Sequence, residues 1–332
     1  MANDTTSILI IGGGGMIGQK LAWRLAENGL GDDAAPRVTL FDLGFPDDGA
    51  PAAERIAGDL TDPAQLKRLA AARHDVIFHL ASIVSGEAEA DFVKGWYTNM
   101  LPMWHFLEAL RGEHEASGGA YVPRVVFSSS IAVFGAPYPD KIGDEFLCAP
   151  QTSYGAQKAA CELMVSDFAR KGFIDGLSIR LPTICVRPGK PNLAASGFFS
   201  GIIREPLNGK EAGLPVPDTV RHWHASPRSA ASFLTHAATL DTDRLEGRRA
   251  LNMPGFSCTV AEQIEALRRA AGQDAVDLIR REPDPTIMRI VDGWPRDFDP
   301  ARATALGFEA ERDFDEIIRV YIEDDLPRAR KG

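Results

Sequence analysis

A short apolar run followed at once by a cluster of glycines constrains the fold of this chain most strongly. The run SILII at Ser7–Ile11 leads into four consecutive glycines, and a helical pattern begins soon after them. Glycines let a backbone turn tightly and approach a pyrophosphate, while the amino end of the next helix offers unpaired N–H groups and a positive dipole. The pattern predicts a dinucleotide-binding turn in one of two registers, Gly12, Gly15 and Gly18 or Gly13, Gly15 and Gly18.

Strand-like and helix-like segments alternate through the first half of the chain. The apolar runs with strand character lie at 7–11, 37–41, 75–80, 124–128 and 177–181. Segments of helical period separate them, at 17–28, 63–72, 98–111 and 153–171. This alternation predicts βαβ units, and hence an α/β fold with a doubly wound parallel sheet.

The pattern changes after Leu181. The stretch TICVRPGKPNLAASGFF is rich in Gly, Pro and Asn, which is typical of a loop that builds a binding site. Helical stretches follow near 225–240, 260–271 and 313–323. We expect residues 1–181, with part of 218–245, to form the dinucleotide-binding lobe, and residues 182–332 to form a smaller, mainly helical substrate lobe.

Carboxylates after the second and third strands indicate which dinucleotide is bound. The second strand ends at Asp42, where a carboxylate can accept hydrogen bonds from the adenosine ribose hydroxyls and would repel a 2′-phosphate. NAD is therefore favoured over NADP. Asp59 and Leu60 follow the next short strand, where they could meet the adenine edge, although a solvated loop position suits Asp59 almost equally well.

A tyrosine and a lysine lie four residues apart at the start of a predicted helix, so Tyr154 and Lys158 share one helix face. A free phenol is a poor base at neutral pH, because its pKa is about 10. A lysine ammonium about 5 Å away stabilises a phenolate by roughly 3 kcal/mol at an effective dielectric near 20.

Upstream, an apolar strand ends in Ser128, Ser129 and Ser130, at the edge where ligands of open α/β sheets bind. One of these hydroxyls would orient the reacting oxygen, or would cap the strand end.

Composition excludes several classes of function. The formal net charge of -10 argues against nucleic acid and against an anionic membrane surface as partners. The first residues lack a basic leader and a long apolar run, so we expect a cytoplasmic protein. The cysteines lie far apart, which fits reduced thiols rather than a zinc site. We expect no metal, since we also expect His222 and His224 to point to opposite faces of a strand.

Basic residues flank the Gly-, Pro- and Asn-rich loop. Arg187, Lys190 and Arg221 lie in segments that we expect to face the cleft, and an arginine fork suits a carboxylate. Each of them could equally form a salt bridge at the surface. Ser85, which follows the fourth-strand region, could bind a substrate hydroxyl.

Together these motifs resemble the extended short-chain dehydrogenase/reductase superfamily, which includes the NAD-dependent epimerases and dehydratases. The resemblance rests on the glycine turn, Asp42, GDL at 58–60, HLAS at 79–82, Asn99, FSSSIAVFG at 127–135 and YGAQK at 154–158. It implies that Ser130, Tyr154 and Lys158 are catalytic and that Asn99 supports a proton relay. It also implies a cofactor site built from Gly12, Gly15, Met16, Ile17, Gly18, Asp42, Asp59, Leu60, Leu80, Ala81, Asn99, Ser128, Tyr154, Lys158, Pro182 and Thr183.

Four further segments resemble the D-erythronate dehydrogenases, which oxidise the 2-hydroxyl of a four-carbon sugar acid with NAD. They are SIVSGEAEADF at 82–92, LPTICVRPGKPN at 181–192, SGFFSGIIREPL at 196–207 and RHWHASP at 221–227. The resemblance implies a sugar-acid substrate bound by Ser85, Ser130, Tyr154, Arg187 and Arg221, and a homodimer, because helices of the superfamily often pair. Two alternatives stay open: an epimerase or dehydratase that retains NAD and acts on a nucleotide-linked sugar, and a non-catalytic NAD-sensing module.

Overall fold

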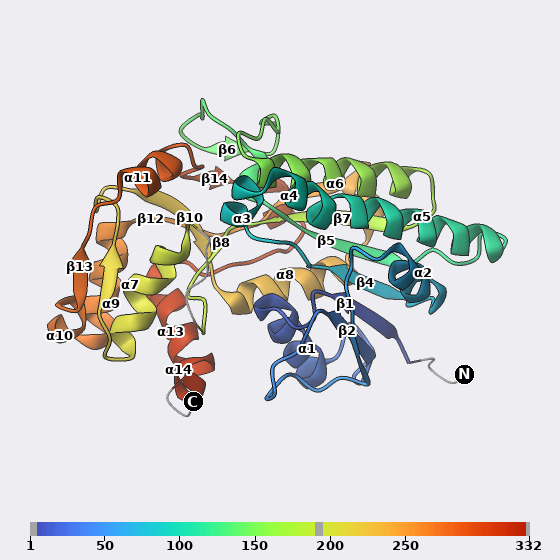
Figure 1. The fold of residues 1–332 in the computed structure, drawn as a ribbon, viewed down its shortest axis with the longest axis horizontal. Helices are drawn as coiled ribbons and strands as arrows, with labels where there is room; N and C mark the ends of the chain where they lie inside the picture. The colour runs from blue at the N-terminus through green and yellow to red at the C-terminus, as the bar shows by residue number, and fades with distance from the viewer. Residues whose placement is uncertain (1–4, 190–194, 330–332) are drawn as a thin grey trace.

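A seven-stranded parallel sheet lies at the centre of the computed structural model, which describes residues 5–189 and 195–329 (Figure 1). Its order is β11-β7-β5-β4-β1-β2-β3, and every neighbouring pair is parallel. The strands are β1 (Ser7–Ile11), β2 (Arg37–Asp42), β3 (Glu54–Ala57), β4 (Val76–His79), β5 (Arg124–Ser130), β7 (Asp175–Leu181) and β11 (Ala250–Asn252). The predicted α/β class and doubly wound parallel sheet are confirmed.

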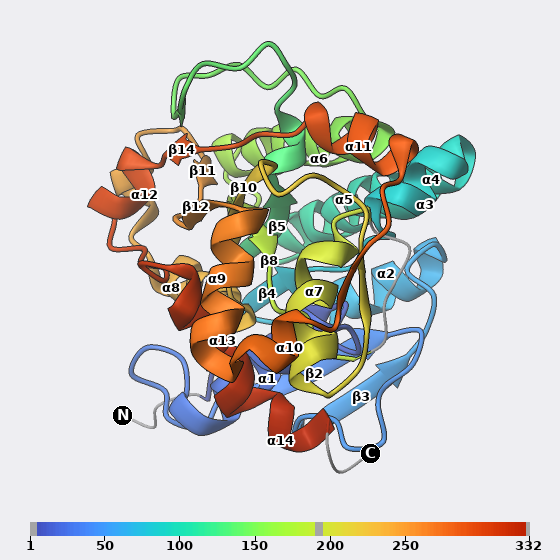
Figure 2. The same ribbon diagram turned by 90° about the vertical axis from the view of Figure 1, so that its left-hand side faces the viewer.

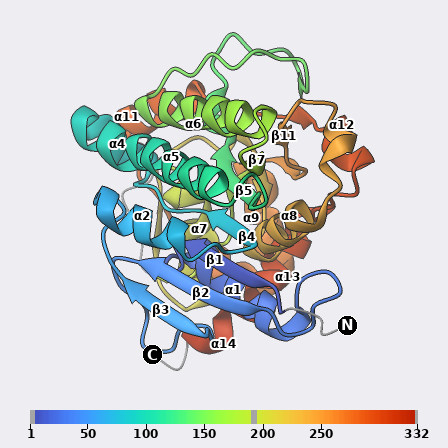
Figure 3. The same cartoon turned by 90° about the vertical axis from the view of Figure 1, so that its right-hand side faces the viewer.

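Alternate residues of the central strands pack against opposite helix layers. Ile8 and Ile10 share one core with the helices α1 (Met16–Asn28) and α8 (Pro227–Thr239). Leu9 and Ile11 share another with α2 (Pro63–Ala71), α5 (Leu101–Ala116) and α6 (Ser153–Arg170). Because side chains alternate along a strand, a strand that is covered on both faces needs a continuous apolar run. Figure 3 shows α2, α5 and α6 together on one side of the sheet.

The helix predicted at 98–111 corresponds mainly to α5, whereas residues 98 and 99 end a separate helix, α4 (Phe92–Asn99), and the two helices meet at Met100. Pro102 stands in the first turn of α5. Proline lacks an N–H group and therefore suits a helix start rather than a helix interior, which explains the break. A further short helix, α3 (Ser85–Ala90), precedes α4 and had no signal in the sequence periodicity.

The chain after Leu181 builds a second lobe around its own apolar core. This lobe is mainly helical (Figure 2). It also contains two small sheets, β12-β10-β8 and β13-β9. Its elements are β8 (Thr183–Ile184), α7 (Gly197–Leu207), β9 (Ala212–Leu214), β10 (Arg221–Ala225), β12 (Phe256–Thr259), α9 (Val260–Ala271), α10 (Gln273–Val276), β13 (Ile279–Arg281), α11 (Pro285–Asp292), α13 (Phe314–Asp324) and α14 (Leu326–Ala329). The remaining elements are β6 (Ile142–Gly143), which pairs with β14 (Phe298–Asp299), α12 (Ala301–Ala305), and the 3-10 turns η1 (Ile131–Val133) and η2 (Thr242–Leu245).

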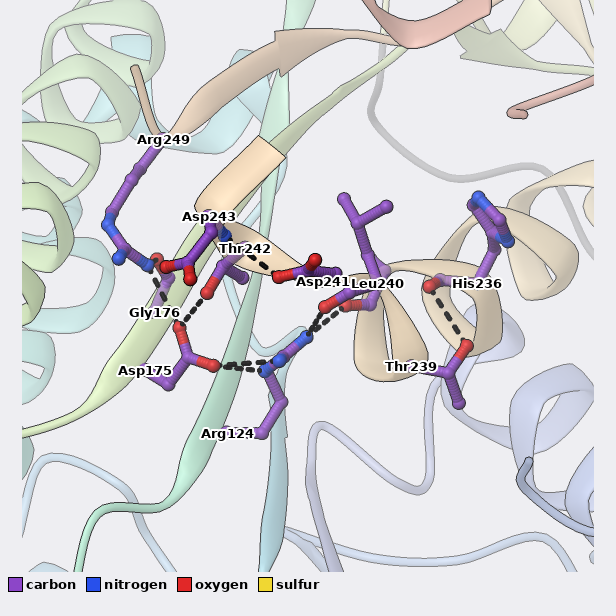
Figure 4. A network of polar contacts seen from close by, with 11 residues as sticks. Arg124, Asp175, Gly176, His236, Thr239, Leu240, Asp241, Thr242, Asp243 and Arg249 are labelled. Carbon is purple, nitrogen blue, oxygen red and sulfur yellow. Dashed lines mark hydrogen bonds and ion pairs between the residues drawn. The ribbon is translucent and has the colours of Figure 1, made fainter. Parts of the chain in front are cut away.

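Part of the chain after Leu181 returns to the central sheet. Strand β11 pairs with β7, and α8 contacts α1 and β5. Arg124 of β5 donates to the carbonyls of Ala237 and Leu240 at the end of α8, and its guanidinium lies 2.7 Å from the Asp175 carboxylate of β7. Asp175 also accepts hydrogen bonds from Thr242 and Arg249, as Figure 4 shows. The division of the chain at residue 181 stays a prediction.

Candidate active site

A cavity of about 510 Å³ opens at the carboxyl ends of β1, β4, β5 and β7. The strand order reverses between β1 and β4, and ligands of doubly wound sheets bind at such a reversal. Most of the predicted site residues line this cavity: Gly12, Gly15, Met16, Ile17, Gly18, Leu80, Ser85, Ser128, Ser130, Tyr154, Lys158, Pro182, Thr183 and Arg187. Of the predicted residues that the structure describes, those that do not line it are Asp42, Asp59, Leu60, Ala81, Asn99 and Arg221.

The glycine turn leaves room for a pyrophosphate. Gly12 has a φ of 92°, which favours glycine, and a Cβ on Gly18 would collide with the Gly12 carbonyl oxygen. Gly15 is the N-cap of α1 and makes no side-chain cap, so the first N–H groups of the helix are available to an anion. A Cβ on Gly13 would instead meet Leu40 of β2, at 2.8 Å. The geometry thus favours the register of Gly12, Gly15 and Gly18, and the residues present fit a dinucleotide.

The two carboxylates that follow β2 and β3 have different surroundings. Asp42 accepts hydrogen bonds from the backbone N–H groups of Gly14 (2.9 Å) and Leu43 (2.7 Å), which hold its carboxylate beside the glycine turn. Asp59 accepts from the N–H and the hydroxyl of Thr61, both at 2.8 Å. The position of Asp42 beside the glycine turn is compatible with the predicted contact to an adenosine ribose, whereas one oxygen of Asp59 accepts two hydrogen bonds within its own loop.

The three serines at the end of β5 have different partners. Ser128 donates to the carbonyl of His79, and Ser129 donates to the buried carboxylate of Glu162 at 2.5 Å. Ser130 instead accepts a hydrogen bond from the N–H of Ala132, at 3.2 Å. Ser130 also lines the cavity, so its own O–H group remains available to donate to a ligand.

Tyr154 and Lys158 stand at the amino end of α6, next to Ser130. The ammonium of Lys158 lies 5.6 Å from the centre of the Tyr154 ring and donates to the carbonyl of Ser128 at 2.8 Å. Lys158 is buried, with 2% of its surface exposed. A Cβ on Gly155 would collide with the Ala132 carbonyl oxygen, so this glycine permits α6 to approach η1 closely. The close approach brings the tyrosine and the serine to one cavity.

His79 is a buried neutral side chain at the end of β4. Burial, helped by the positive charge of Lys158, lowers its pKa to about 3. Its ring packs near Phe106 and Phe127 in the core. This surrounding fits the interpretation of His79 as a core histidine.

Asn99 holds the loop that follows β4. Its side-chain oxygen Oδ1 accepts from the N–H of Ile83 (2.8 Å), and its side-chain Nδ2 donates to Oε1 of Gln157 of α6 (2.7 Å). These bonds support the part of the loop that carries Leu80, Ser82 and Ser85 to the cavity.

The structure separates the two candidate arginines. Arg187 is half-buried and lines the cavity, and burial lowers the pKa of its guanidinium. Arg221 pairs with Glu262 at 3.2 Å and donates to the carbonyl of Ser257 at 3.1 Å, away from the cavity. The placement of Arg221 in the substrate site is not supported by this geometry, because its guanidinium is engaged in an exposed ion pair. Lys190 lies outside the described residues.

His222 and His224 lie on the same face of β10, with their ring centres 5.3 Å apart and both rings against Phe199. The expectation that they point to opposite faces was wrong, because residues two apart in a strand share a face. Burial lowers the pKa of both rings, that of His222 to about 4. His222 lines the cavity, where its Nδ1 meets the carbonyl of Pro295 and its Nε2 meets the hydroxyl of Thr183, each at 2.7 Å.

Sequence reasoning missed several residues that line the cavity. They are Phe134, Gln151, Thr152, Ser196, Gly197, Ser200, Arg204, Gly293, Trp294 and Pro295. Those of α7 lie in a segment that carries the finer resemblance, but Trp294 lies far along the chain and has no motif around it. Among the residues that the structure describes, no group of His, Cys, Asp and Glu could hold a metal ion, and no helix could span a membrane.

A doubly wound sheet whose point of strand reversal carries this glycine turn defines a dinucleotide-binding protein. Residues 8–225 match the NAD dependent epimerase/dehydratase family. The chain is 45% identical to a D-erythronate dehydrogenase of Cupriavidus necator, over 96% of this chain and 98% of that protein. It is 40% identical to a D-erythronate dehydrogenase of Haemophilus influenzae, over 96% and 99%. The chain therefore belongs to the NAD dependent epimerase/dehydratase family, and NAD is its cofactor.

A solved structure confirms the fold in detail. The crystal structure described as the nucleoside-diphosphate-sugar epimerase from Agrobacterium tumefaciens is 55% identical in sequence and superposes with a TM-score of 0.93. The match covers 97% of this chain and 95% of that one.

Proposed function

We propose that this chain is a cytoplasmic, NAD-dependent dehydrogenase that oxidises the 2-hydroxyl of a short sugar acid, D-erythronate, to the 2-oxo acid. The observation that carries the proposal is the Arg187 guanidinium. It lines the cavity together with Ser130, Tyr154 and Lys158, and its two terminal nitrogens have no hydrogen-bond partner among the described residues. A half-buried cation of this kind suits an anionic substrate. The full-length relatives named D-erythronate dehydrogenase support the same substrate.

Each of the residues around the cavity has its own role in the proposed reaction. Bound NAD supplies the acceptor for the hydride that leaves C2 of the acid. Ser130 donates a hydrogen bond to the 2-hydroxyl, Tyr154 removes its proton, and Lys158 stabilises the phenolate. Arg187 holds the carboxylate next to the reacting carbon, and Ser85 contacts a further hydroxyl. The backbone of the glycine turn binds the pyrophosphate, and Asp42 binds the adenosine ribose.

The charge of the substrate can be tested with a matched pair of substrates and a matched pair of variants. We expect the unaltered enzyme to oxidise D-erythronate and to leave erythritol, which lacks the carboxylate, almost untouched. We expect Arg187→Ala to lower kcat/KM for D-erythronate by about 10²-fold or more. Arg221→Ala removes an exposed ion pair with Glu262 and a hydrogen bond to the Ser257 carbonyl, both away from the cavity, and should change kcat/KM by less than about fivefold. Equal oxidation of both substrates by the unaltered enzyme would contradict the carboxylate site.

The name of the Agrobacterium structure favours a second function, epimerisation of a nucleotide-linked sugar. An epimerase returns its cofactor to the oxidised form in each turnover, so it needs no external NAD. The two functions are separated by the absorbance of NADH at 340 nm during turnover. Accumulation of NADH with D-erythronate supports the dehydrogenase, whereas turnover of a nucleotide-linked sugar without net NADH supports the epimerase.

A homodimer is also part of the proposal. The neighbouring helices α4, α5 and α6 expose large apolar side chains, those of Phe92, Val93, Tyr97, Trp104 and Leu163. Apolar side chains that gather on one face of a protein mark an interaction surface. Sedimentation of the unaltered chain should give a dimer, and Tyr97→Glu should shift it toward the monomer. A monomer at micromolar concentration would contradict this part of the proposal.

A further inference from the structure

Arg187 is fixed by hydrogen bonds to its backbone as well as to its side chain. Its N–H donates to the hydroxyl of Ser200 at 3.0 Å, and its carbonyl accepts from Nη1 of Arg204 at 2.8 Å. Its Nε donates to the carbonyl of Ile184 at 3.0 Å. Three hydrogen bonds thus fix the backbone and the side chain of Arg187, and its terminal nitrogens are the donors left for a ligand.

Both backbone partners of Arg187 come from one face of α7. Ser200 and Arg204 are four residues apart, so they lie one above the other on the helix. Both are buried, with 2% and 5% of their surface exposed. The buried hydroxyl and the buried guanidinium thus bind the two peptide groups on either side of the Arg187 Cα, whereas other residues of the same helix, which include Phe199 and Ile203, pack in the apolar core.

The charge of Arg204 is already matched within the protein. Its Nε and Nη2 pair with the carboxylate of Glu205 at 2.8 and 2.7 Å. Nη1 is therefore the part of this guanidinium that acts on Arg187, and it meets a carbonyl rather than a charged group. Although Arg204 lines the cavity, Arg187 is the arginine whose charge faces it without a partner among the described residues.

We propose that Ser200 and Arg204 are positioning residues, which hold the backbone of Arg187 so that its guanidinium stays directed at the substrate carboxylate. The identity of that anion rests on the proposed function, but the positioning itself does not. A displacement of about 1 Å in a binding group can cost about 10²-fold in rate, so a rigid support at Arg187 would improve selectivity for an acid over a neutral polyol.

Kinetics with D-erythronate test the positioning role. We expect Arg204→Met to raise KM by about 10-fold or more and to change kcat by less than about threefold. Arg204→Lys retains a donor that can reach the Arg187 carbonyl and should recover most of the loss. Arg269→Met makes the same chemical change in an exposed pair with Asp315 of the same lobe, and should leave KM within about twofold.

A double-mutant cycle separates positioning from general damage to the lobe. If Arg204 acts through Arg187, Arg204→Met should add less than about twofold to KM in a chain that already carries Arg187→Ala. The proposal is overturned if Arg204→Met raises KM equally with and without Arg187. It is also overturned if Arg204→Met leaves KM unchanged.

Amide hydrogen exchange of residues 184–189 gives a readout that needs no substrate. Ser200→Ala and Arg204→Met should each speed exchange in this segment by about 10-fold or more, while Arg204→Lys should not. Unchanged exchange in both variants would refute the positioning role. Faster exchange, together with equal oxidation of D-erythronate and erythritol by the unaltered enzyme, would retain the positioning role and refute the sugar-acid function.

Discussion

At the scale of single residues, Tyr154 carries the clearest expectation. Tyr154→Phe removes the phenolic oxygen that we propose as the acceptor of the substrate proton, but it keeps the ring beside Lys158. We expect kcat with D-erythronate to fall by about 10²- to 10⁴-fold, which is the usual share of a general base. The dissociation constant for NAD, measured by fluorescence titration, should stay within about threefold, because the glycine turn and Asp42 are untouched. Near-normal turnover in this variant would show that another group removes the proton.

Local sequence patterns nominated these residues, but among the three adjacent serines only the family resemblance singled out Ser130. The hydrogen-bond partners give the physical distinction: Ser128 and Ser129 donate to other groups, whereas the Ser130 hydroxyl makes no donor bond to the described residues. The same holds for Arg187 and Arg221, since burial and ion pairing depend on residues far away in the chain. Local motifs predict which residue types meet at a site, whereas tertiary contacts decide which of several residues of the same type reaches the cavity.

At the scale of elements, the contact between α6 and η1 sets the distance between Tyr154 and Ser130. Gly155→Ala would place a Cβ against the Ala132 carbonyl and should force the two elements apart. We expect a loss of about 1–3 kcal/mol in the free energy of unfolding and a lower kcat. The matched control is Gly112→Ala on α5, where a new Cβ meets no atom of the described residues within 4 Å and should stabilise the helix by up to about 1 kcal/mol without changing kcat.

The outcome is read from chemical denaturation curves and initial rates of the two variants. Equal stability and equal kcat for Gly155→Ala and the unaltered chain would mean that the contact between α6 and η1 accommodates the added methyl group. A loss of stability in Gly112→Ala would show that replacing a helical glycine by alanine destabilises this protein even without a steric clash. In that case Gly112→Ala could not serve as the control for Gly155→Ala.

Elements with a strong period were predictable, and short elements were not. Strand β1 and helix α9 have the bounds that their apolar patterns indicated. By contrast, β8 has two residues and β9 has three, which is too short for any alternation to be recognised. The break at Met100 was missed because the apolar pattern of α4 runs into that of α5, and only Pro102 signals the new start.

At the scale of the whole molecule, Asp175 joins the central sheet to the segment that returns to it. Burial would raise the pKa of Asp175, but hydrogen bonds from Thr242 and Arg249 and the charges of Arg124 and Arg249 outweigh burial and lower it below 3.8. A carboxyl whose pKa is lower in the folded state stabilises the fold above its unfolded pKa, and this contribution is lost as the pH falls through the folded pKa.

We therefore expect Asp175→Asn to lower the free energy of unfolding by roughly 2 kcal/mol at pH 7, with a difference that shrinks as the pH falls through the acid range below about 4. Urea denaturation at a series of pH values measures this. Asp167→Asn, in an exposed pair with Arg170, serves as the control and should change stability by less than about 0.5 kcal/mol. A difference for Asp175→Asn that stays constant over this pH range would contradict the assignment.

The return of α8 and β11 to the central sheet also matters for biosynthesis. A ribosome releases the chain from its N-terminus at about 5–20 residues per second, so β1 to β7 emerge well before the elements that complete their sheet. Until α8 has left the exit tunnel, one apolar face of the sheet stays uncovered, and until Ala250–Asn252 follows, β7 has an unpaired edge. Unpaired strand edges invite association with other chains. We therefore expect the nascent nucleotide-binding lobe to bind chaperones that act during translation.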